Sequence, residues 1–274
     1  ALDIAKHADA VIFFGGLCQA VEGEDGQKEG LPEGLISQGD RTSLDLPGIQ
    51  ETLLKRLHAT GKPIILVLLN GSAVAIQWAS DNVPAIIEAW YPGEEGGTAI
   101  ADVLFGFYNP AGRLPVTFYR STDDLPPFED YAMKGRTYRY FTGAPLYPFG
   151  YGLSYTQFDY TDIACNHLHI KADEVCDVSV TVSNIGALAG DEVVQLYAST
   201  NREGYPQTQL VGFTRIHLLP NESKRTTISV GASQFMRVTD TGERQLEQGT
   251  FTLYIGGGQP RWSSGLTMDV EIIS

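Results

Sequence analysis

Two glutamates separated by one glycine, Glu22 and Glu24 in the sequence VEGE, are the residues best suited to acid–base chemistry. In an extended conformation, residues two positions apart point to the same side, and Gly23 allows the backbone to turn closely. A carboxyl group acts as a general acid near neutral pH when burial or a neighbouring carboxylate raises its pKa. One of the two glutamates could therefore be a proton donor.

The same stretch also fits a solvated acidic loop, in which Asp25, Glu29 and Glu33 are ordinary surface charges. Carboxylates two positions apart are common, and by itself their spacing favours this plainer interpretation. However, residues 17–46 show little helical or strand periodicity. Loops of that length inside compact domains are uncommon unless they are functional or disordered. A functional loop is therefore the sharper hypothesis, and the residues alone leave both open.

A second charged pair, Asp40 and Arg41 in QGDRTSLDLP, lies near the far end of this loop. The two side chains could form an ion pair that anchors the loop, or they could be exposed charges. We favour the anchor, because a loop that delivers a catalytic group must be held at both ends.

The elements that position the loop alternate between strand and helix. Residues 10–16 form an apolar run that predicts a strand buried on both faces. Further strands are predicted at 63–70 and 84–91, and helices at 1–8, 46–62, 72–80 (with Ser72 as a candidate cap) and 94–106. This alternation predicts a parallel sheet with crossover helices, and ligands bind beyond the carboxyl ends of such strands. The acidic loop follows one of these ends.

Two aromatic residues, Trp90 and Tyr91, close the third predicted strand. They could contact a sugar by stacking on the face of its ring, but aromatic residues at strand ends more often pack against the core or another domain. Both interpretations are kept.

The second half of the chain has a different pattern. Prolines, glycines and tyrosines dominate residues 109–160, which indicates an ordered connecting segment. From about residue 177, short segments with a period of two alternate with turns, as in an antiparallel β-sandwich. The predicted fold class is α/β plus all-β, with an α/β domain at 1–120, a connecting segment at 121–165 and a β-sandwich at 166–274.

The overall charge limits the partners. A formal net charge of −14 and a pI near 4.7 argue against nucleic acid or an anionic membrane and favour a neutral substrate. The three cysteines, Cys18, Cys165 and Cys176, indicate no disulfide framework or metal site and are expected to be thiols. The first residues lack the pattern of a signal peptide, and the location, cytoplasmic or secreted, stays open.

Several long motifs in order carry a family resemblance. GLCQAVEGE, GDRTSLDLPGIQ, GKPIILVLLNGSAVAIQWA, EAWYPGEEGGTAIADVLFGFYNPAGRLPVTF and YPFGYGLSYTQFDY together resemble the C-terminal part of glycoside hydrolase family 3, of the β-xylosidase or β-glucosidase type. SNIGALAGDEVVQLYAS and LEQGTFTLYIGG resemble that family's fibronectin type III-like domain. The resemblance covers nearly the whole chain and implies that the first domain is an α/β sandwich.

The resemblance implies a retaining hydrolysis of β-linked sugars that needs no metal or nucleotide. In this family a catalytic aspartate, the nucleophile, lies on an N-terminal (β/α)8 barrel, which has no counterpart here and is the expected partner. The acid/base glutamate falls in VEGE, with Glu24 preferred over Glu22 because in relatives it lies just ahead of an aspartate–arginine pair. Here an insertion, DGQKEGLPEGLISQG, separates them.

Two functions compete. In the first, the chain carries the acid/base half of a glycosidase acting on xylosides, glucosides or arabinosides, and by itself is incomplete and inactive. In the second, it is a non-catalytic carbohydrate-binding or scaffolding fragment. The chain does not determine which sugar is recognised.

Overall fold

The computed structural model describes residues 1–22, 41–239 and 241–273, which form two compact units. Unit 1 comprises Ala1–Leu104, Thr117–Asp130 and Gly143–Tyr147. Unit 2 comprises Phe105–Val116, Tyr131–Thr142 and Pro148–Ser274. Within the described ranges, every helix is too short or too polar to cross a bilayer.

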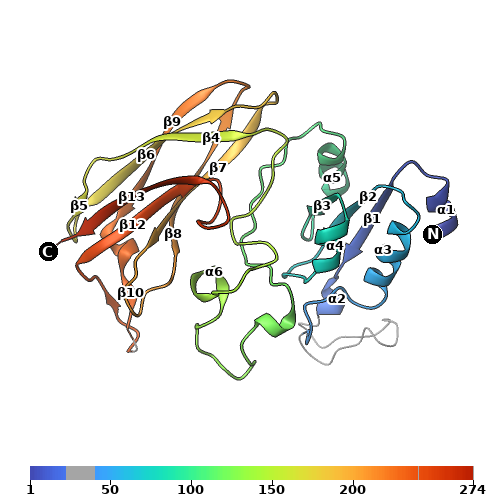
Figure 1. Cartoon of the computed structure of the whole chain (residues 1–274), viewed down its shortest axis with the longest axis horizontal. Helices are drawn as coiled ribbons and strands as arrows, with labels where there is room; N and C mark the ends of the chain where they lie inside the picture. The colour runs from blue at the N-terminus through green and yellow to red at the C-terminus, as the bar shows by residue number, and fades with distance from the viewer. Residues whose placement is uncertain (23–40, 240, 274) are drawn as a thin grey trace. The chain divides into compact units, whose positions relative to one another are not determined.

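Unit 1 is built on three parallel strands in the order β1-β2-β3 (Figure 1). Its elements are α1 (Leu2–Lys6), β1 (Val11–Gly16), α2 (Gln19–Glu22), α3 (Gln50–His58), β2 (Ile64–Leu69), α4 (Gln77–Asn82), β3 (Ala85–Glu88), α5 (Gly96–Leu104) and η1 (Thr122–Asp124). All six residues of the central strand β2, IILVLL, are apolar, and the strand is mostly buried. The predicted parallel sheet with crossover helices is therefore confirmed.

The edge strand β1 leaves apolar side chains exposed. Ile12 is 43% exposed and Phe14 55% exposed, and residues two apart on a strand share a face. One face of β1 is therefore an uncovered apolar surface within unit 1.

The helix predicted at 72–80 starts later than expected. Ala75 pairs with Asp45 in an isolated parallel bridge, and its N–H donates to the Leu44 carbonyl over 2.7 Å. Because residues around 75 are held extended by this pairing, α4 begins only at Gln77, with Ile76 and not Ser72 at its N-cap. Ser72 is thereby left free for a different partner.

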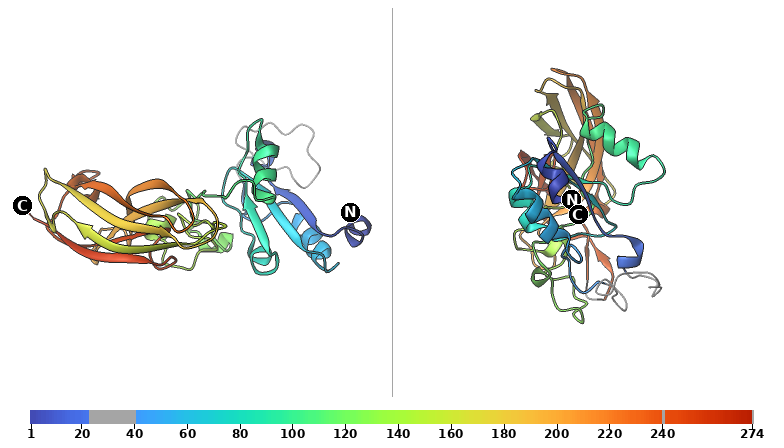
Figure 2. Two further views of the ribbon diagram at one scale, coloured as in Figure 1. Left: turned by 90° about the horizontal axis from the view of Figure 1, so that it is seen from above. Right: turned by 90° about the vertical axis from the view of Figure 1, so that its right-hand side faces the viewer.

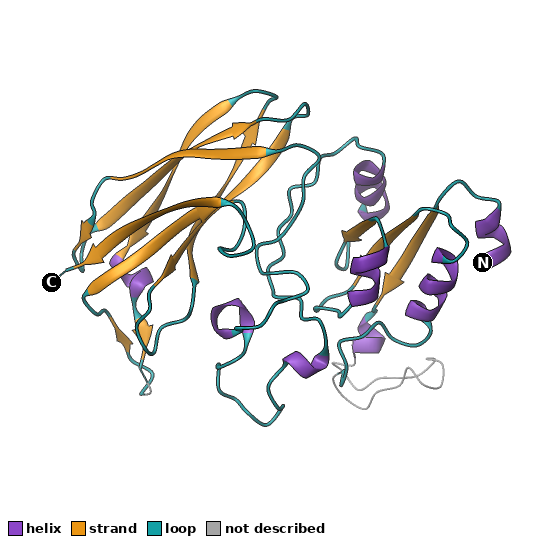
Figure 3. Cartoon of the chain, in the orientation of Figure 1, coloured by secondary structure: helices purple, strands orange, loops and turns teal. Residues whose placement is uncertain are grey.

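Unit 2 is a β-sandwich of a five-stranded sheet, β5-β13-β12-β7-β8, and a three-stranded sheet, β4-β6-β9. Figure 2 (left) shows these strands running alongside one another, and Figure 3 separates them from the loops. The elements are α6 (Thr137–Tyr140), β4 (Phe158–Cys165), β5 (His169–Ile170), β6 (Val175–Asn184), β7 (Gly190–Ser199), β8 (Gln209–Leu218), β9 (Ser223–Gly231), η2 (Ala232–Phe235), β10 (Arg237–Val238), β11 (Arg244–Gln245), β12 (Gly249–Gly256) and β13 (Gly265–Ile272).

The period-two pattern fills the core of this sandwich. Val178, Val180 and Val182 on β6 are fully buried and belong to one apolar cluster with side chains of the facing sheet. The predicted fold class, α/β followed by an all-β sandwich, is confirmed. The strand β4 begins inside the segment predicted as a connection and pairs with β6. The domain bounds predicted at 120 and 165 stay a prediction.

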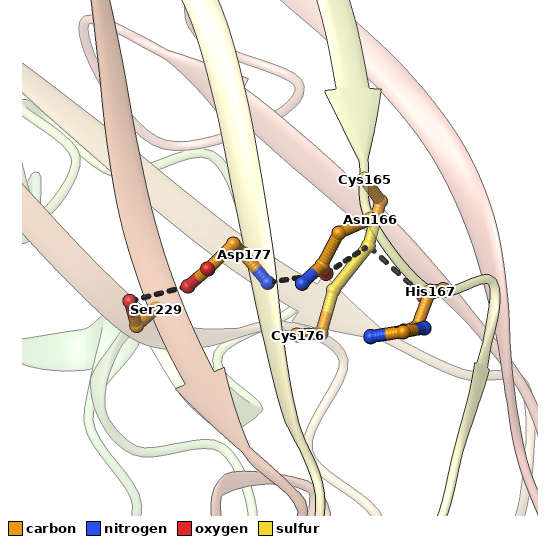
Figure 4. Close-up of a disulfide and its surroundings, with 6 residues drawn as sticks. All are labelled: Cys165, Asn166, His167, Cys176, Asp177 and Ser229. Carbon is orange, nitrogen blue, oxygen red and sulfur yellow. Dashed lines mark hydrogen bonds between the residues drawn. A yellow bond between two sulfur atoms is a disulfide. The ribbon is translucent and has the colours of Figure 1, made fainter.

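The expectation that all three cysteines are thiols is wrong. Cys165, at the end of β4, forms a disulfide with Cys176 on β6 (Figure 4). The antiparallel register pairs Cys165 with Val178, so that the Cα atoms of the two cysteines lie 6.6 Å apart, within the range that a disulfide spans. Cys18 is a free, exposed cysteine.

Candidate active site

The candidate site of unit 1 lies where its three parallel strands end. Glu22 ends α2, which follows β1 after only two residues. Gly71 and Ser72 follow β2 closely, and Tyr91 follows β3. Because the strands are parallel, their carboxyl ends share one edge of the sheet, where α/β proteins commonly bind ligands.

The end of β1 is tightly held. The Gln50 side chain, at the start of α3, accepts a hydrogen bond from the Gly16 N–H over 2.7 Å and donates to the Gly16 carbonyl over 2.8 Å. Gly16 has a φ of 125°, and a Cβ there would lie 2.2 Å from the Leu69 carbonyl oxygen. Only glycine fits at this approach of β1 to β2, which brings α2 to its place.

Three donors surround the Glu22 carboxylate. Oε1 accepts from the Ser72 hydroxyl at 2.6 Å and from the Gly71 N–H at 3.3 Å, and Oε2 accepts from the Tyr91 hydroxyl at 2.8 Å. Partial burial acts to raise the pKa of Glu22, but these hydrogen bonds and the charge of Arg41 outweigh it, so the pKa is lowered. Glu22 is therefore an anion at neutral pH, which does not suit a proton donor.

Arg41, which follows residues 23–40 in the sequence, contacts the Ser72 hydroxyl that also binds Glu22. Its Nη2 donates to the Ser72 Oγ over 3.0 Å and to the Ala73 carbonyl over 2.9 Å. Arg41 was predicted as half of an anchoring ion pair with Asp40; its hydrogen bonds to Ser72 and Ala73 fit an anchor at the end of β2, and the anchor role stays a prediction. Asp40 and Glu24 lie outside the described residues, so their predicted roles stay predictions.

The sequence missed a second carboxyl group, Glu88, at the end of β3. Its Oε2 accepts from the Asn70 side-chain amide over 3.2 Å, and its Oε1 from the Trp90 N–H over 3.1 Å. The amide of Asn70 also donates to the Ser72 carbonyl over 3.0 Å, which links the Glu88 end of the network to the Glu22 end. Burial raises the pKa of Glu88 to about 7.

The side chains of Trp90 and Tyr91 make different contacts. Trp90 adopts a φ of 54°, unusual for a residue other than glycine, and its ring packs edge-on against Phe118 with centroids 6.1 Å apart. The Tyr91 side chain instead directs its hydroxyl to Glu22, and Tyr91 is 44% exposed. The edge-on contact of Trp90 fits the packing alternative, and the predicted sugar contact stays a prediction for both residues.

Replacing Glu88 with glutamine is expected to flatten the pH dependence of stability. Because the folded-state pKa lies above the ordinary value of 4.5, Glu88 contributes stability below pH 4.5 that is lost as the pH rises through about 7. The variant should avoid this loss, which amounts to at most about 3 kcal/mol at pH 8. Urea unfolding between pH 4.5 and 8, followed by tryptophan fluorescence, measures it. If the free energy of unfolding changed with pH in the same way for Glu88→Gln and for the unmodified chain, the raised pKa of Glu88 would be contradicted.

Within the described part of the chain, no three His, Cys, Asp or Glu side chains gather in a way that would hold a metal ion. The side chains at the strand ends instead form a hydrogen-bonded network, here called the frame, with one anionic carboxyl group, Glu22, and one readily protonated carboxyl group, Glu88. Its other members are Arg41, Asn70, Gly71, Ser72 and Tyr91. Ser72, Asn70 and Glu88 were not predicted as site residues, because each has a partner that is distant in sequence. Their positions at or just beyond strand ends were a usable signal.

Comparison with known proteins identifies the domains of the chain. Residues 1–155 match the glycosyl hydrolase family 3 C-terminal domain, and residues 192–259 match a fibronectin type III-like domain. A xylan 1,4-β-xylosidase from Xylanibacter ruminicola is 46% identical over 216 residues, which cover 78% of this chain and 24% of that protein. A periplasmic β-glucosidase from Salmonella typhimurium is 37% identical, over 97% of this chain and 35% of that protein.

A comparison with solved structures also finds glycosidases of which this chain covers only a part. A β-glucosidase from Erythrobacter marinus superposes with a TM-score of 0.84 at 32% identity, covering 99% of this chain and 35% of that one. The chain thus spans about a quarter to a third of the length of these relatives. With one match over its first 155 residues and the second within its β-sandwich, the chain belongs to glycosyl hydrolase family 3, as that family's C-terminal domain followed by a fibronectin type III-like domain.

Proposed function

We propose that the protein containing this chain hydrolyses β-linked glycosides with retention, and that Glu24 is its acid/base residue. Membership of glycosyl hydrolase family 3 supports the hydrolysis. The observation that supports the choice of Glu24 is the frame at the strand ends, where Ser72 hydrogen-bonds to both Glu22 and Arg41. The frame holds the chain on either side of residues 23–40, which include Glu24.

The roles of the two catalytic carboxyl groups follow from the retaining mechanism. Glu24 protonates the departing glycosidic oxygen, and an aspartate outside these 274 residues attacks the anomeric carbon to form a glycosyl-enzyme. Glu24 then removes a proton from the water that releases the sugar. The anionic state of Glu22 supports the assignment of the acid role to Glu24.

The substrate is proposed from the relatives. The two curated relatives described above are a xylan 1,4-β-xylosidase and a β-glucosidase, so we propose β-xylosides or β-glucosides of plant oligosaccharides as substrates.

The uncovered apolar face of β1, with Ile12 and Phe14, supports a further covering element from a longer protein.

Assay of the 274-residue chain and of the longer protein against aryl β-xyloside and aryl β-glucoside tests this division of the two roles between the chain and the rest of the longer protein. We expect turnover only from the longer protein, because the nucleophile is supplied by its N-terminal part. Turnover by the chain alone would show that the nucleophile lies within it. Failure of the longer protein on both substrates would favour a non-catalytic, carbohydrate-binding or scaffolding role.

A further inference from the structure

The VEGE sequence holds two glutamates, but the proposed reaction needs only one acid/base residue. The hydrogen bonds of Glu22 indicate a role for this second glutamate. Both of its carboxylate oxygens accept hydrogen bonds, from Ser72, Gly71 and Tyr91. An oxygen held in this way at two strand ends is poorly placed to transfer a proton to a substrate.

Ser72 is shared by two residues that are distant in sequence. Its hydroxyl donates to Glu22 over 2.6 Å and accepts from Arg41 over 3.0 Å. One hydroxyl just beyond β2 therefore binds a residue before the 23–40 segment and a residue after it. The Asn70 amide, which donates to the Ser72 carbonyl, holds Ser72 itself in place.

Gly71 makes room for this arrangement. A Cβ at this position would lie 2.9 Å from Glu22 Oε2 and 2.8 Å from Tyr91 Cε2. The close approach of the Glu22 carboxylate and the Tyr91 ring to the backbone therefore depends on the missing side chain. Three consecutive residues, Asn70 to Ser72, thus take part in holding Glu22.

We propose that Glu22 is a positioning residue, which fixes the chain two residues before Glu24 through its bonds to Ser72, Gly71 and Tyr91. This inference rests on the function proposed above. Because Glu24 follows so closely, fixing Glu22 limits where the Glu24 carboxyl can lie. A displacement of about 1 Å can lower a catalytic rate by about a hundredfold, so the loss of this anchor is expected to be visible in the kinetics.

The test uses Glu22→Gln in the longer protein, assayed with aryl glycosides of increasing leaving-group pKa. We expect kcat/KM to fall about 10- to 100-fold for poor leaving groups and to stay within a few-fold for activated ones, which need little proton assistance. Added azide should rescue Glu22→Gln far less than Glu24→Gln, because Glu24 is still present to activate water. Glu129→Gln, which neutralises an exposed glutamate of unit 1, is the matched control and should behave like the unmodified enzyme.

One further variant keeps the test informative if Glu22→Gln folds poorly, and a double variant tests whether Glu22 and Ser72 act through the same contact. Tyr91→Phe removes one donor to Glu22 but keeps the ring, and should show the same leaving-group pattern with a smaller loss. Ser72→Ala combined with Glu22→Gln should cost less than the sum of the single losses, since both break the same contact.

The outcomes separate the inference from the proposed function. Wild-type-like kinetics of both Glu22→Gln and Tyr91→Phe across the series would overturn the positioning role and leave the glycosidase assignment intact. Azide rescue of Glu22→Gln that equals or exceeds that of Glu24→Gln would overturn it too, because Glu22 would then be the acid/base residue itself. Lack of turnover by the unmodified longer protein would instead overturn the proposed function.

Discussion

Glu24→Gln in the longer protein is expected to lower kcat/KM for glycosides with poor leaving groups by about 10²- to 10⁴-fold, the usual contribution of a general acid. Activated aryl glycosides should lose far less in kcat/KM, because their leaving groups depart without protonation. The measurement is a plot of log kcat/KM against leaving-group pKa, which should be much steeper for the variant than for the unmodified enzyme.

The Glu22→Gln variant supplies the comparison for this plot. Glu22 is held by three donors and has a lowered pKa, so its replacement should cost less than that of Glu24. If Glu22→Gln gave the steep plot and Glu24→Gln the shallow one, the acid/base role would move by two residues.

Replacing Arg113 with methionine is expected to destabilise unit 2 by about 3–5 kcal/mol, because it leaves a buried carboxylate without its counter-charge. The Arg113 Nη2 lies 2.8 Å from Glu192 Oε2, and the two side chains are only 10% and 4% exposed. The other Glu192 oxygen accepts from the Tyr160 hydroxyl over 2.6 Å, so Arg113 supplies the only cation that the structure pairs with Glu192 among its described residues. Hydrogen exchange of the β7 amides measures the loss within unit 2.

Two controls define this result. The double replacement Arg113→Met with Glu192→Leu should be less destabilising than Arg113→Met alone, because it removes the unpaired charge as well. Glu51→Gln breaks the exposed pair of Glu51 with Lys55 and should cost less than about 1 kcal/mol. A similarly small loss for Arg113→Met would show that Glu192 is neutral or solvated in the folded protein.

The regular elements of the chain could be predicted because their signals are local. The apolar run of β2 and the alternating valines of β6 each define an element within about ten residues, and both occur as expected. The start of α4 could not be predicted in this way. Its first turn is delayed by the bridge between Asp45 and Ala75, a contact across 30 positions of sequence.

The candidate site was predicted in part. Glu22 and Arg41 were singled out from sequence, but the hydroxyl that joins them, Ser72, was interpreted as a helix cap. Glu88 was missed, since its raised pKa results from burial and so depends on the folded sheet. The Cys165–Cys176 disulfide was missed for the same reason, because it depends on the register of β4 against β6.

The most direct test of the account is the product that Glu24→Gln forms with azide in the longer protein. Azide attacks a glycosyl-enzyme without needing a general base, so an enzyme that lacks only its acid/base residue should recover activity on an activated aryl glycoside. We expect the product to be a β-glycosyl azide, with net retention, identified by proton NMR. Absence of rescue and of any glycosyl azide, or a product of α configuration, would contradict the assignment of Glu24 as the acid/base residue of a retaining glycosidase.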